Sequence, residues 1–381
     1  MIDFFQKILK KKEISDEEYF KEIKEIDQQY KEIVEKFKGS FPRPLNSITE
    51  RETFFKKFDK NEKYNPQIKY ETRTYDPTII EKLDNFKINL KNDKYGFKKL
   101  YEKKIHFKKN QFYCFEHWGE PKSTKYAEIY WGKPNYLTYL KAKKFCKNFK
   151  RQKVKFTKIT LDELEKGLKD EVKRLTGEEL KVEYKVLPNK ITINPQKKRI
   201  TINPDERYTN LDFKRLITHE IGVHYMRCYN GRQRGFGILK DGTSNVTETE
   251  EGLAAYTEEL KGVASKAQMY IYAGRVIASY YAPKKSFYEI FKILKKYNFK
   301  NSDAYTLTLR AKRNICDTSQ KGGFTKDFVY FAGYLKVKKY AKKYNIRDLF
   351  IGKVKIDDLK DKRLRKYIKI NRDKIKTIFD E

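Results

Sequence analysis

The segment LITHEIGVHYM (residues 216–226) holds two of the chain's four histidines, and a glutamate follows the first of them. Imidazole nitrogens are preferred zinc ligands, and a glutamate beside the first histidine can act as a general base on water. In the common H-E-x-x-H pattern the histidines lie one helical turn apart on one face. His219 and His224 are five residues apart, which rotates the second side chain by roughly 140° in a regular α-helix. We therefore predict a π-bulge, which Gly222 would tolerate, that lets both histidines bind one metal ion, with Glu220 as the base.

A third ligand is expected in the next helix, VTETEEGLAAYTEEL (residues 246–260), because no further histidine follows in the sequence. The candidate carboxylates are those of Glu248, Glu250, Glu251, Glu258 and Glu259. Small residues after Glu251 (Gly252, Ala254 and Ala255) would let this helix pack close to the motif helix. Glutamates near a helix start are also favoured by the helix dipole alone, so composition leaves the choice among the five open.

The elements that must position these residues can be read from caps and periodicity. Thr160 and Glu163 form a capping-box pattern that opens a helix ending at Gly177. Alternating apolar residues over 182–186, 191–193 and 200–202 predict three short strands. Thr209 or Asn210 then caps the motif helix, which Asn230 and Gly231 are expected to end. Further helices are expected at about 249–264, 266–282, 287–297, 302–314, 325–344 and 356–376.

The chain is long enough, at 381 residues, for one large domain or two ordinary ones. A helix is predicted from Ser15 to Phe37, where Ser15 and Glu18 resemble a capping box, and residues 41–150 show further helices and loops. We expect an α+β fold that is mostly helical. Residues 1–150 would form a mostly helical N-terminal region and residues 151–381 the catalytic domain, with one continuous unit as the alternative.

The chain is strongly basic, with 87 Lys and Arg against 52 Asp and Glu and a net charge of +35. Such a charge attracts polyanions, although the abundance of Lys, Asn, Ile, Tyr and Phe also fits an AT-rich coding sequence. The four cysteines are scattered, which predicts reduced, buried thiols. Neither a signal peptide nor an apolar segment of membrane-spanning length is seen. We therefore expect a cytoplasmic protein with no membrane partner.

The motif region resembles the tyrosine carboxypeptidase zincins, the family of the microtubule-associated tyrosine carboxypeptidases and of QEGLA-motif proteins. HEIGVHYMR, NGRQ and TEEGLA carry this resemblance, and GGFTKDFVYFAG (residues 322–333) is similar to a second family segment. The similarity covers roughly residues 45–345. It implies a zincin-like metalloprotease domain in which His219, His224 and Glu251 bind Zn²⁺ and Glu220 is the base. Glu250 stands where the family has glutamine.

The resemblance implies a zinc carboxypeptidase that acts on a peptide or protein with a free C-terminus, an acidic tail being one candidate. Tyr330 is the expected donor to the oxyanion of the transition state, with Tyr225 in reserve. The candidates for binding the substrate carboxylate are Arg227, Arg232 and Arg313, with Lys326 behind them. Asp327 would either orient a ligand histidine or cap a helix.

Two other functions remain open from the sequence. One is a zincin endopeptidase or aminopeptidase, which would not need a cation for a terminal carboxylate. The other is a basic nucleic-acid-binding protein with a non-catalytic metal site. The charge suits this reading, but the sequence does not favour it, because it shows no RNP motif, zinc finger or helix-turn-helix signature.

Overall fold

Helices dominate this computed structural model, which describes residues 14–37, 41–151, 156–187 and 189–380. The five strands among the described residues form only two small sheets, so the expected α+β, mostly helical class is confirmed. The zincin-like assignment itself stays a prediction. Among the described residues, none of the helices is both long and apolar enough to cross a membrane.

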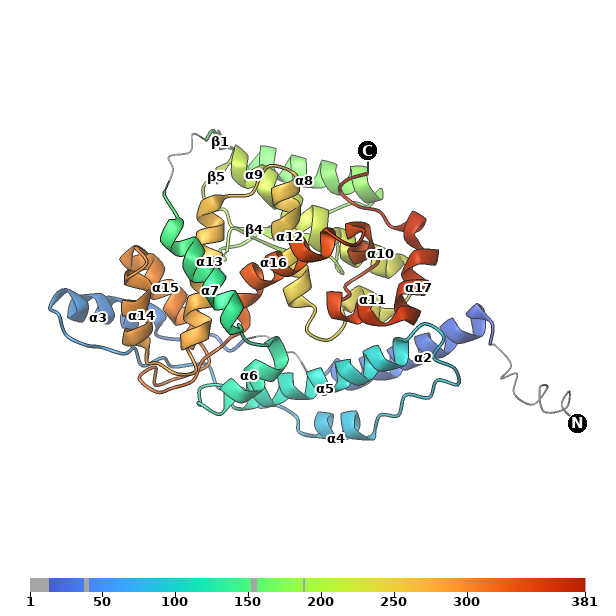
Figure 1. The fold of residues 1–381 in the computed structure, drawn as a ribbon, viewed down its shortest axis with the longest axis horizontal. Coiled ribbons are helices and arrows are strands. Elements are labelled where there is room, and N and C mark those ends of the chain that lie inside the picture. Colours follow the sequence, from blue (N-terminus) through green and yellow to red (C-terminus); the bar gives the residue numbers. More distant parts are fainter. Residues whose placement is uncertain (1–13, 38–40, 152–155, 188, 381) are drawn as a thin grey trace, which may run out of the picture.

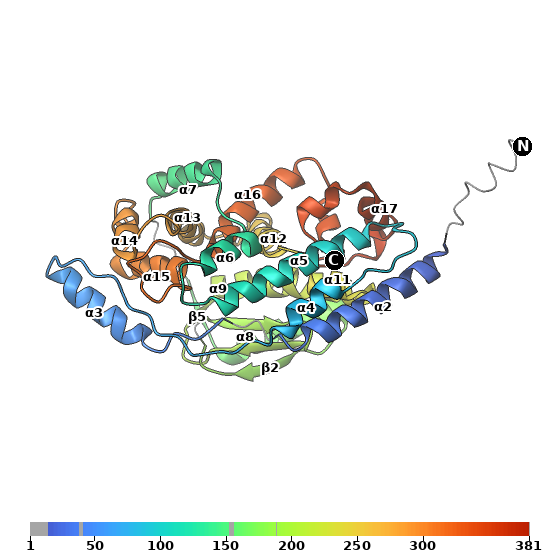
Figure 2. The ribbon, with the colours of Figure 1, turned by 90° about the horizontal axis from the view of Figure 1, so that it is seen from below.

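The first part of the chain is helical, as predicted. Its helices are α2 (Asp16–Val34), α3 (Ser47–Asp59), α4 (Thr78–Asn85), α5 (Phe97–Glu116), α6 (Ser123–Trp131) and α7 (Tyr136–Asn148). The Ser15 hydroxyl accepts a hydrogen bond from the Glu18 amide, which caps α2. Figures 1 and 2 show α2 and α5 running along one side of the molecule, with α3 beside α14 and α15 at the other end.

A small sheet precedes the motif helix, which confirms the expected order of elements. Its strands are β2 (Lys181–Tyr184), β3 (Ile191–Asn194) and β4 (Arg199–Ile202), in the order β2-β4-β3. β4 pairs parallel to β2 and antiparallel to β3, which leaves β3 at an edge. Before it lies α8 (Leu161–Thr176), with the predicted capping box at Thr160 and left-handed Gly177 at its end. β1 (Lys158–Ile159) pairs separately with β5 (Tyr208–Thr209).

The motif helix is continuous but changes its winding. It runs through α9 (Asn210–Leu216), the π-helix η1 (Ile217–Tyr225) and α10 (Met226–Gln233), and Thr209 caps its start. The predicted end at Asn230 and Gly231 is wrong. Gly231 lies inside α10, where a Cβ would come 2.4 Å from the Leu239 carbonyl oxygen. The missing side chain at Gly231 lets α10 pack closely against the backbone of α11 (Gly237–Asp241), and it does not end the helix.

The rest of the chain is helical, as expected. Its elements are α12 (Thr247–Leu260), α13 (Lys266–Tyr281), α14 (Phe287–Lys295), α15 (Asn301–Lys312), η2 (Lys326–Phe328), α16 (Val329–Ala341), η3 (Ile346–Phe350), η4 (Ile356–Lys360), α17 (Lys362–Ile370) and η5 (Arg372–Lys374). One prediction fails here: the single helix expected over 356–376 is broken into η4, α17 and η5. Asp361 has extended backbone and caps α17, because its side chain accepts from the Arg363 amide.

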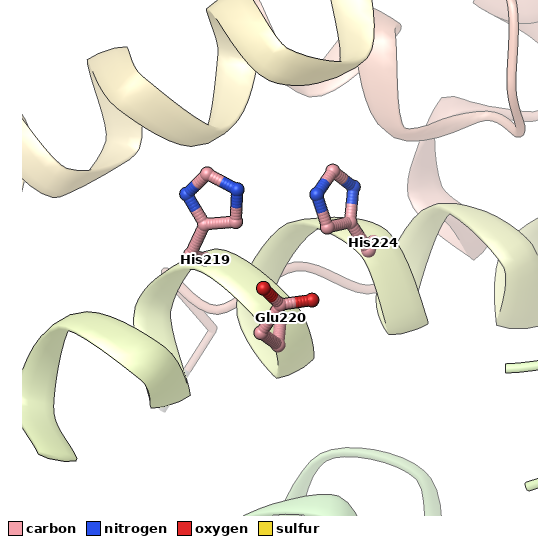
Figure 3. A group of neighbouring side chains, drawn as sticks. All are labelled: His219, Glu220 and His224. Atoms are coloured by element: carbon pink, nitrogen blue, oxygen red, sulfur yellow. The ribbon is translucent and has the colours of Figure 1, made fainter. Parts of the chain in front are cut away.

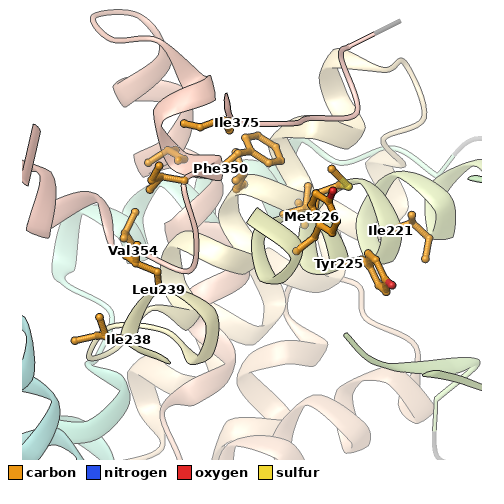
Figure 4. Close-up of a cluster of buried hydrophobic side chains, with 14 of the residues drawn as sticks. Ile221, Tyr225, Met226, Ile238, Leu239, Phe350, Val354 and Ile375 are labelled. Carbon is orange, nitrogen blue, oxygen red and sulfur yellow. The ribbon is translucent and has the colours of Figure 1, made fainter. Parts of the chain in front are cut away.

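The buried apolar side chains bring both parts of the chain together. One cluster joins Tyr19 and Phe97 to Leu164, Tyr225 and Ile375, and Figure 4 shows the part of it between the motif helix and the C-terminal elements. A second cluster packs Phe54 of α3 against α13, α14 and α15. These shared clusters do not define a domain boundary, so the predicted division between residues 1–150 and 151–381 stays a prediction. Three cysteines are buried as expected, but Cys316 is exposed, which corrects the prediction for that residue.

Candidate active site

The two motif histidines face the same side of the helix because they lie on the π-helix η1. The Met226 amide donates to the Ile221 carbonyl, five residues back, which is the π-helical pattern. One such turn brings the ring centroids of His219 and His224 to 4.8 Å. Figure 3 shows both rings projecting toward α12, with the Glu220 carboxylate beside the interval between them. The predicted widening of the helix is confirmed.

Gly222 has a different role from the expected one. Its φ is not positive, so the backbone there does not depend on glycine. A Cβ at this position would lie 2.4 Å from Cδ1 of Ile378, in the last described residues of the chain. The missing side chain makes room for the C-terminal segment to pack on the motif helix.

Glu251 of α12 lies opposite both histidines. Its Oε2 is 3.4 Å from Nε2 of His219 and 3.8 Å from Nε2 of His224. Burial raises the pKa of Glu251, but the hydrogen bond from His219 and the charges of the two histidines outweigh it, so this pKa lies below its usual value. Glu220 supplies a second carboxylate, with its ligand atom within 4.8 Å of those of the histidines. These four side chains could hold a metal ion.

The Nδ1 atoms of both histidines contact carboxylates of α12, a feature missed in the sequence. Nδ1 of His219 is 2.7 Å from Glu258 Oε1, and Nδ1 of His224 is 3.0 Å from Glu250 Oε1. A carboxylate at Nδ1 fixes the ring orientation and leaves Nε2 for a metal ion. The sequence does show the glutamates between residues 248 and 259. Their spacing alone does not distinguish a metal ligand from a carboxylate that orients a ligand histidine.

Arg227 is fully buried and bound to the backbone, which corrects its assignment to the substrate carboxylate. Its side chain is fully buried and donates to the carbonyl oxygens of Leu349, Gly352 and Val354, and to Glu250 at 3.2 Å. Lys353 also contacts Glu250, at 3.2 Å. Burial would raise the pKa of Glu250, but Lys353, Arg227 and His224 outweigh it, so this pKa falls well below its usual value. Arg227 therefore supports the carboxylate that holds His224.

Arg232 and Tyr225 are also removed from the catalytic candidates. Both donate to Oε2 of Glu178, each at 2.6 Å. Tyr225 is fully buried, and neither residue is among those that line the cavity beside the histidines. Tyr225 points away from its neighbour His224, because consecutive helical residues do not share a face.

A cavity of about 400 Å³ opens beside the two histidines. His219, Glu220, His224, Glu251 and Tyr330 line it, together with the edge strand β3. One edge of β3 pairs with β4, and the other has no strand partner within the described ranges. Concave sites with a few convergent polar groups are typical of ligand and substrate binding.

Tyr330 reaches this cavity from α16, as expected. Backbone contact between α12 and α16 places it there: a Cβ on Gly252 would lie 2.1 Å from the carbonyl carbon of Gly333. The missing side chain at Gly252 therefore allows α12 to pack closely against α16. The prediction was that it would allow α12 to pack against the motif helix. Burial, and then the charge of Glu251, raises the pKa of the Tyr330 hydroxyl well above its ordinary value. The hydroxyl stays protonated and can donate a hydrogen bond.

A basic cluster surrounds Asp327 next to Tyr330. Arg310 and Arg313 both donate to the Asp327 carboxylate, Arg313 at 2.8 Å. The Arg275 guanidinium carbon is 4.5 Å from the centroid of the Tyr330 ring, and Lys326 acts electrostatically on Glu251. Asp327 contacts neither histidine, so its predicted role there is wrong. Arg275 and Arg310 were missed, because nothing in their local sequence separates them from surface charges.

Two imidazoles, two carboxylates within reach of them and an adjoining cavity are the side-chain set found in metal-dependent hydrolases. The sequence model of the family described as "Microtubule-associated tyrosine carboxypeptidase" matches residues 52–368. The chain therefore belongs to this family, which confirms the resemblance seen in its motifs.

The sequence identity to individual relatives is modest and covers only part of each protein. The chain is 32% identical over 157 residues to microtubule-associated tyrosine carboxypeptidase 1 of Mus musculus, covering 39% of this chain and 32% of that protein. It is 31% identical over 153 residues to the Homo sapiens protein of the same name, covering 38% of this chain and 31% of that protein. The matched region thus spans about a third of the length of these relatives.

Proposed function

We propose that the protein is a zinc-dependent carboxypeptidase, which removes the C-terminal residue of a peptide or protein. The observation that supports it is the arrangement of His219 and His224. Both Nε2 atoms face one oxygen of Glu251, while carboxylates of Glu250 and Glu258 contact both Nδ1 atoms. This is the donor set that zinc prefers, with the supporting groups that usually accompany it. The names of the relatives add that members of the family act as carboxypeptidases.

In this proposal His219, His224 and Glu251 hold the ion. When bound, zinc would polarise the scissile carbonyl and ease deprotonation of water. Glu220 is partly exposed in the cavity and is not needed as a ligand, so it can accept the proton of the attacking water and pass it to the leaving amine. The protonated Tyr330 hydroxyl donates to the oxygen that becomes negative in the transition state.

The basic cluster provides the cation that a carboxypeptidase needs. Arg310 and Arg313 form ion pairs with Asp327, and Arg275 and Lys326 interact with it electrostatically. One carboxylate among four cationic side chains leaves positive charge next to Tyr330. Arg275 also has a buried Nε without a hydrogen-bond partner in the described part of the chain. These residues do not themselves line the cavity, but Arg275 packs on the ring of Tyr330, which does. We propose that Arg275 and this cluster bind the terminal carboxylate of the substrate, in place of Arg227, which is bound to buried carbonyl groups, and Arg232, which is paired with Glu178.

The free edge of β3 suits the backbone of the bound chain. An extended peptide can add to a sheet edge through main-chain hydrogen bonds without demanding a particular sequence. A protein substrate with a free C-terminus fits this arrangement, and a C-terminal tyrosine is the first residue to test, because the relatives are named tyrosine carboxypeptidases. Cytoplasmic location remains a prediction.

The test combines metal content with hydrolysis of matched peptides. His219→Ala and Glu251→Ala should lose zinc, whereas Glu220→Gln should keep zinc and lose hydrolysis. The wild-type protein should release the last residue of peptides with a free C-terminus and not of their amidated forms. Equal cleavage of both forms would favour the endopeptidase or aminopeptidase alternative. Full zinc content in Glu251→Ala would overturn the ligand assignment.

A further inference from the structure

Helix α7 has one face in the protein core and one face in solvent. Its buried residues Tyr139, Ala142 and Cys146 recur at helical spacing and join the apolar cluster that also holds side chains of α13, α14 and α15. Figure 2 shows α7 as the outermost element on the side of the molecule opposite β2. The residues on the other face of α7 are therefore available to a partner.

The first turns of α7 expose large apolar side chains. Tyr136, Leu137 and Leu140 are 59%, 69% and 37% exposed. Leu140 lies three residues after Leu137 and four after Tyr136, so the three side chains share one face of the helix. A single apolar residue at a protein surface is normal, but a group of adjoining ones is typical of an interaction site.

The later turns of this outer face are cationic. Lys141, Lys144 and Lys147 are exposed, and none of them forms an ion pair or a side-chain hydrogen bond within the described ranges. Lysines elsewhere, such as Lys169, pair with a glutamate. The surrounding sequence explains this difference, because residues 129–161 contain ten Lys and Arg and no Asp or Glu. Acids make up 52 of the 381 residues, so their absence over this length is not the average composition of the chain.

A cavity of about 620 Å³ between α7 and α16 extends the apolar surface. Phe145, Phe149 and Leu335 are part of its wall. Lys141 and Lys144 line it as well, and lysines in such a position lay their methylene groups on apolar surface and keep the ammonium group outside. Apolar and cationic groups therefore form one continuous surface on this side of the protein.

We propose that this surface of α7 binds a bilayer that contains anionic lipids. An acidic protein would pair with the lysines but would leave the exposed tyrosine and leucines against polar groups. At a lipid surface both kinds of side chain are accommodated, since apolar side chains enter the boundary between headgroups and acyl chains while lysines stay among the phosphates. The expectation of no membrane partner came from a search for spanning segments, which this mode of binding does not require.

Vesicle co-sedimentation at physiological ionic strength tests the proposal. The whole chain is mixed with vesicles of phosphatidylcholine alone, and with vesicles of equal parts phosphatidylcholine and phosphatidylserine. One variant replaces the three lysines together (Lys141→Gln, Lys144→Gln and Lys147→Gln), and a second replaces the two leucines (Leu137→Ser and Leu140→Ser). Zinc and substrate play no part in this measurement, so its outcome is independent of the proposed function.

A matched control removes the same charge from another exposed helix face. Lys21, Lys24 and Lys31 are exposed on α2, and the control variant replaces all three with glutamine. Thermal unfolding checks that every variant folds, which is expected because all of the substituted side chains are exposed. Soluble polyglutamate, bound to the same set of proteins, represents an acidic protein partner.

We expect the wild type to bind the vesicles with phosphatidylserine and not those of phosphatidylcholine alone. Each lysine near an anionic surface contributes about fivefold to partitioning, so the α7 lysine variant should lose at least about tenfold in binding. The α2 variant should stay close to the wild type. The leucine variant should also lose about tenfold, because its apolar side chains no longer enter the lipid.

Three results would overturn the proposal. Equal losses in the two lysine variants would mean that the net charge of the protein, and not the face of α7, attracts the vesicles. Wild-type binding by the leucine variant would exclude insertion into lipid. A leucine variant that loses polyglutamate binding as strongly as vesicle binding would make this face a docking site for an acidic protein.

Discussion

Gly252 of α12 and Gly333 of α16 meet backbone to backbone, with no space for a side chain on either. A Cβ on Gly333 would lie 1.9 Å from the Glu248 carbonyl oxygen, and one on Gly252 would lie 2.1 Å from the Gly333 carbonyl carbon. α12 carries Glu251 and α16 carries Tyr330. This contact therefore sets the distance between a candidate metal ligand and the candidate oxyanion donor.

Gly252→Ala should force these helices apart. We expect a loss of about 1–3 kcal/mol in the free energy of unfolding, typical of overpacking, measured by urea denaturation. The same variant should lose kcat. Lys266→Ala, at an exposed position at the start of α13, is the control and should change neither quantity. Unchanged stability in Gly252→Ala would mean that the two helices can separate freely.

Glu258→Gln should weaken zinc binding without removing a ligand. The carboxylate at Nδ1 of His219 orients the ring and strengthens its Nε2 as a donor, and loss of such a group lowers metal affinity by roughly 10- to 100-fold. Competition with a chelator measures the change. The neighbouring Glu259 contacts Tyr334 and Lys338 instead, so Glu259→Gln should bind zinc as the wild type does. Equal affinities in the two variants would contradict the role of Glu258.

Arg227→Met should unfold the protein more easily and should not act as a substrate-binding variant. It leaves three carbonyl groups and Glu250 without their buried donor, and breaking a buried ion pair costs about 3–5 kcal/mol. Chemical denaturation measures this loss, with Arg174→Met at a more exposed position as control. A stable variant with a raised KM for peptides with a free C-terminus would restore the carboxylate-binding role of Arg227.

Tyr330→Phe should lower kcat by roughly 10²–10³-fold, the usual effect of losing one oxyanion donor. Zinc content and stability should stay at wild-type values, because the tyrosine ring is retained. Tyr334 lies one turn further on α16 and donates to Glu259, outside the cavity. Tyr334→Phe should keep its activity. A fully active Tyr330→Phe would place the donor elsewhere.

Local signals made much of the fold predictable. Caps at Ser15, Thr160 and Thr209 depend on residues three positions away, and each lies where it was expected. The π-helix was predictable because two histidines five residues apart can share a metal ion only if the turn widens. Boundaries failed where a distant neighbour decided them, as at Gly231, whose close contact comes from α11.

The supporting residues of the site were the hardest to predict. Arg227 is adjacent to the motif, which made it attractive as a substrate ligand, but the three carbonyl groups that it binds lie more than 120 residues further along the chain. Arg275 and Arg310 reach the site only because α13 and α15 pack around Asp327, which the local sequence does not predict. The roles of Glu250 and Glu258 depend on which side of α12 faces the histidines, and five glutamates in one short segment do not settle that.

The π-helix also shows how the longer motif relates to the shorter H-E-x-x-H form. The extra residue between Glu220 and His224 is absorbed within one widened turn, and the helix beyond it is regular. Deleting one residue from this turn would restore the four-residue spacing of the histidines, and Arg227 and Gly231 would keep their offsets from His224, and with them their contacts with Glu250 and Leu239. Short and long versions of the motif therefore differ by one insertion inside a single turn, which leaves the register of the rest of the helix unchanged.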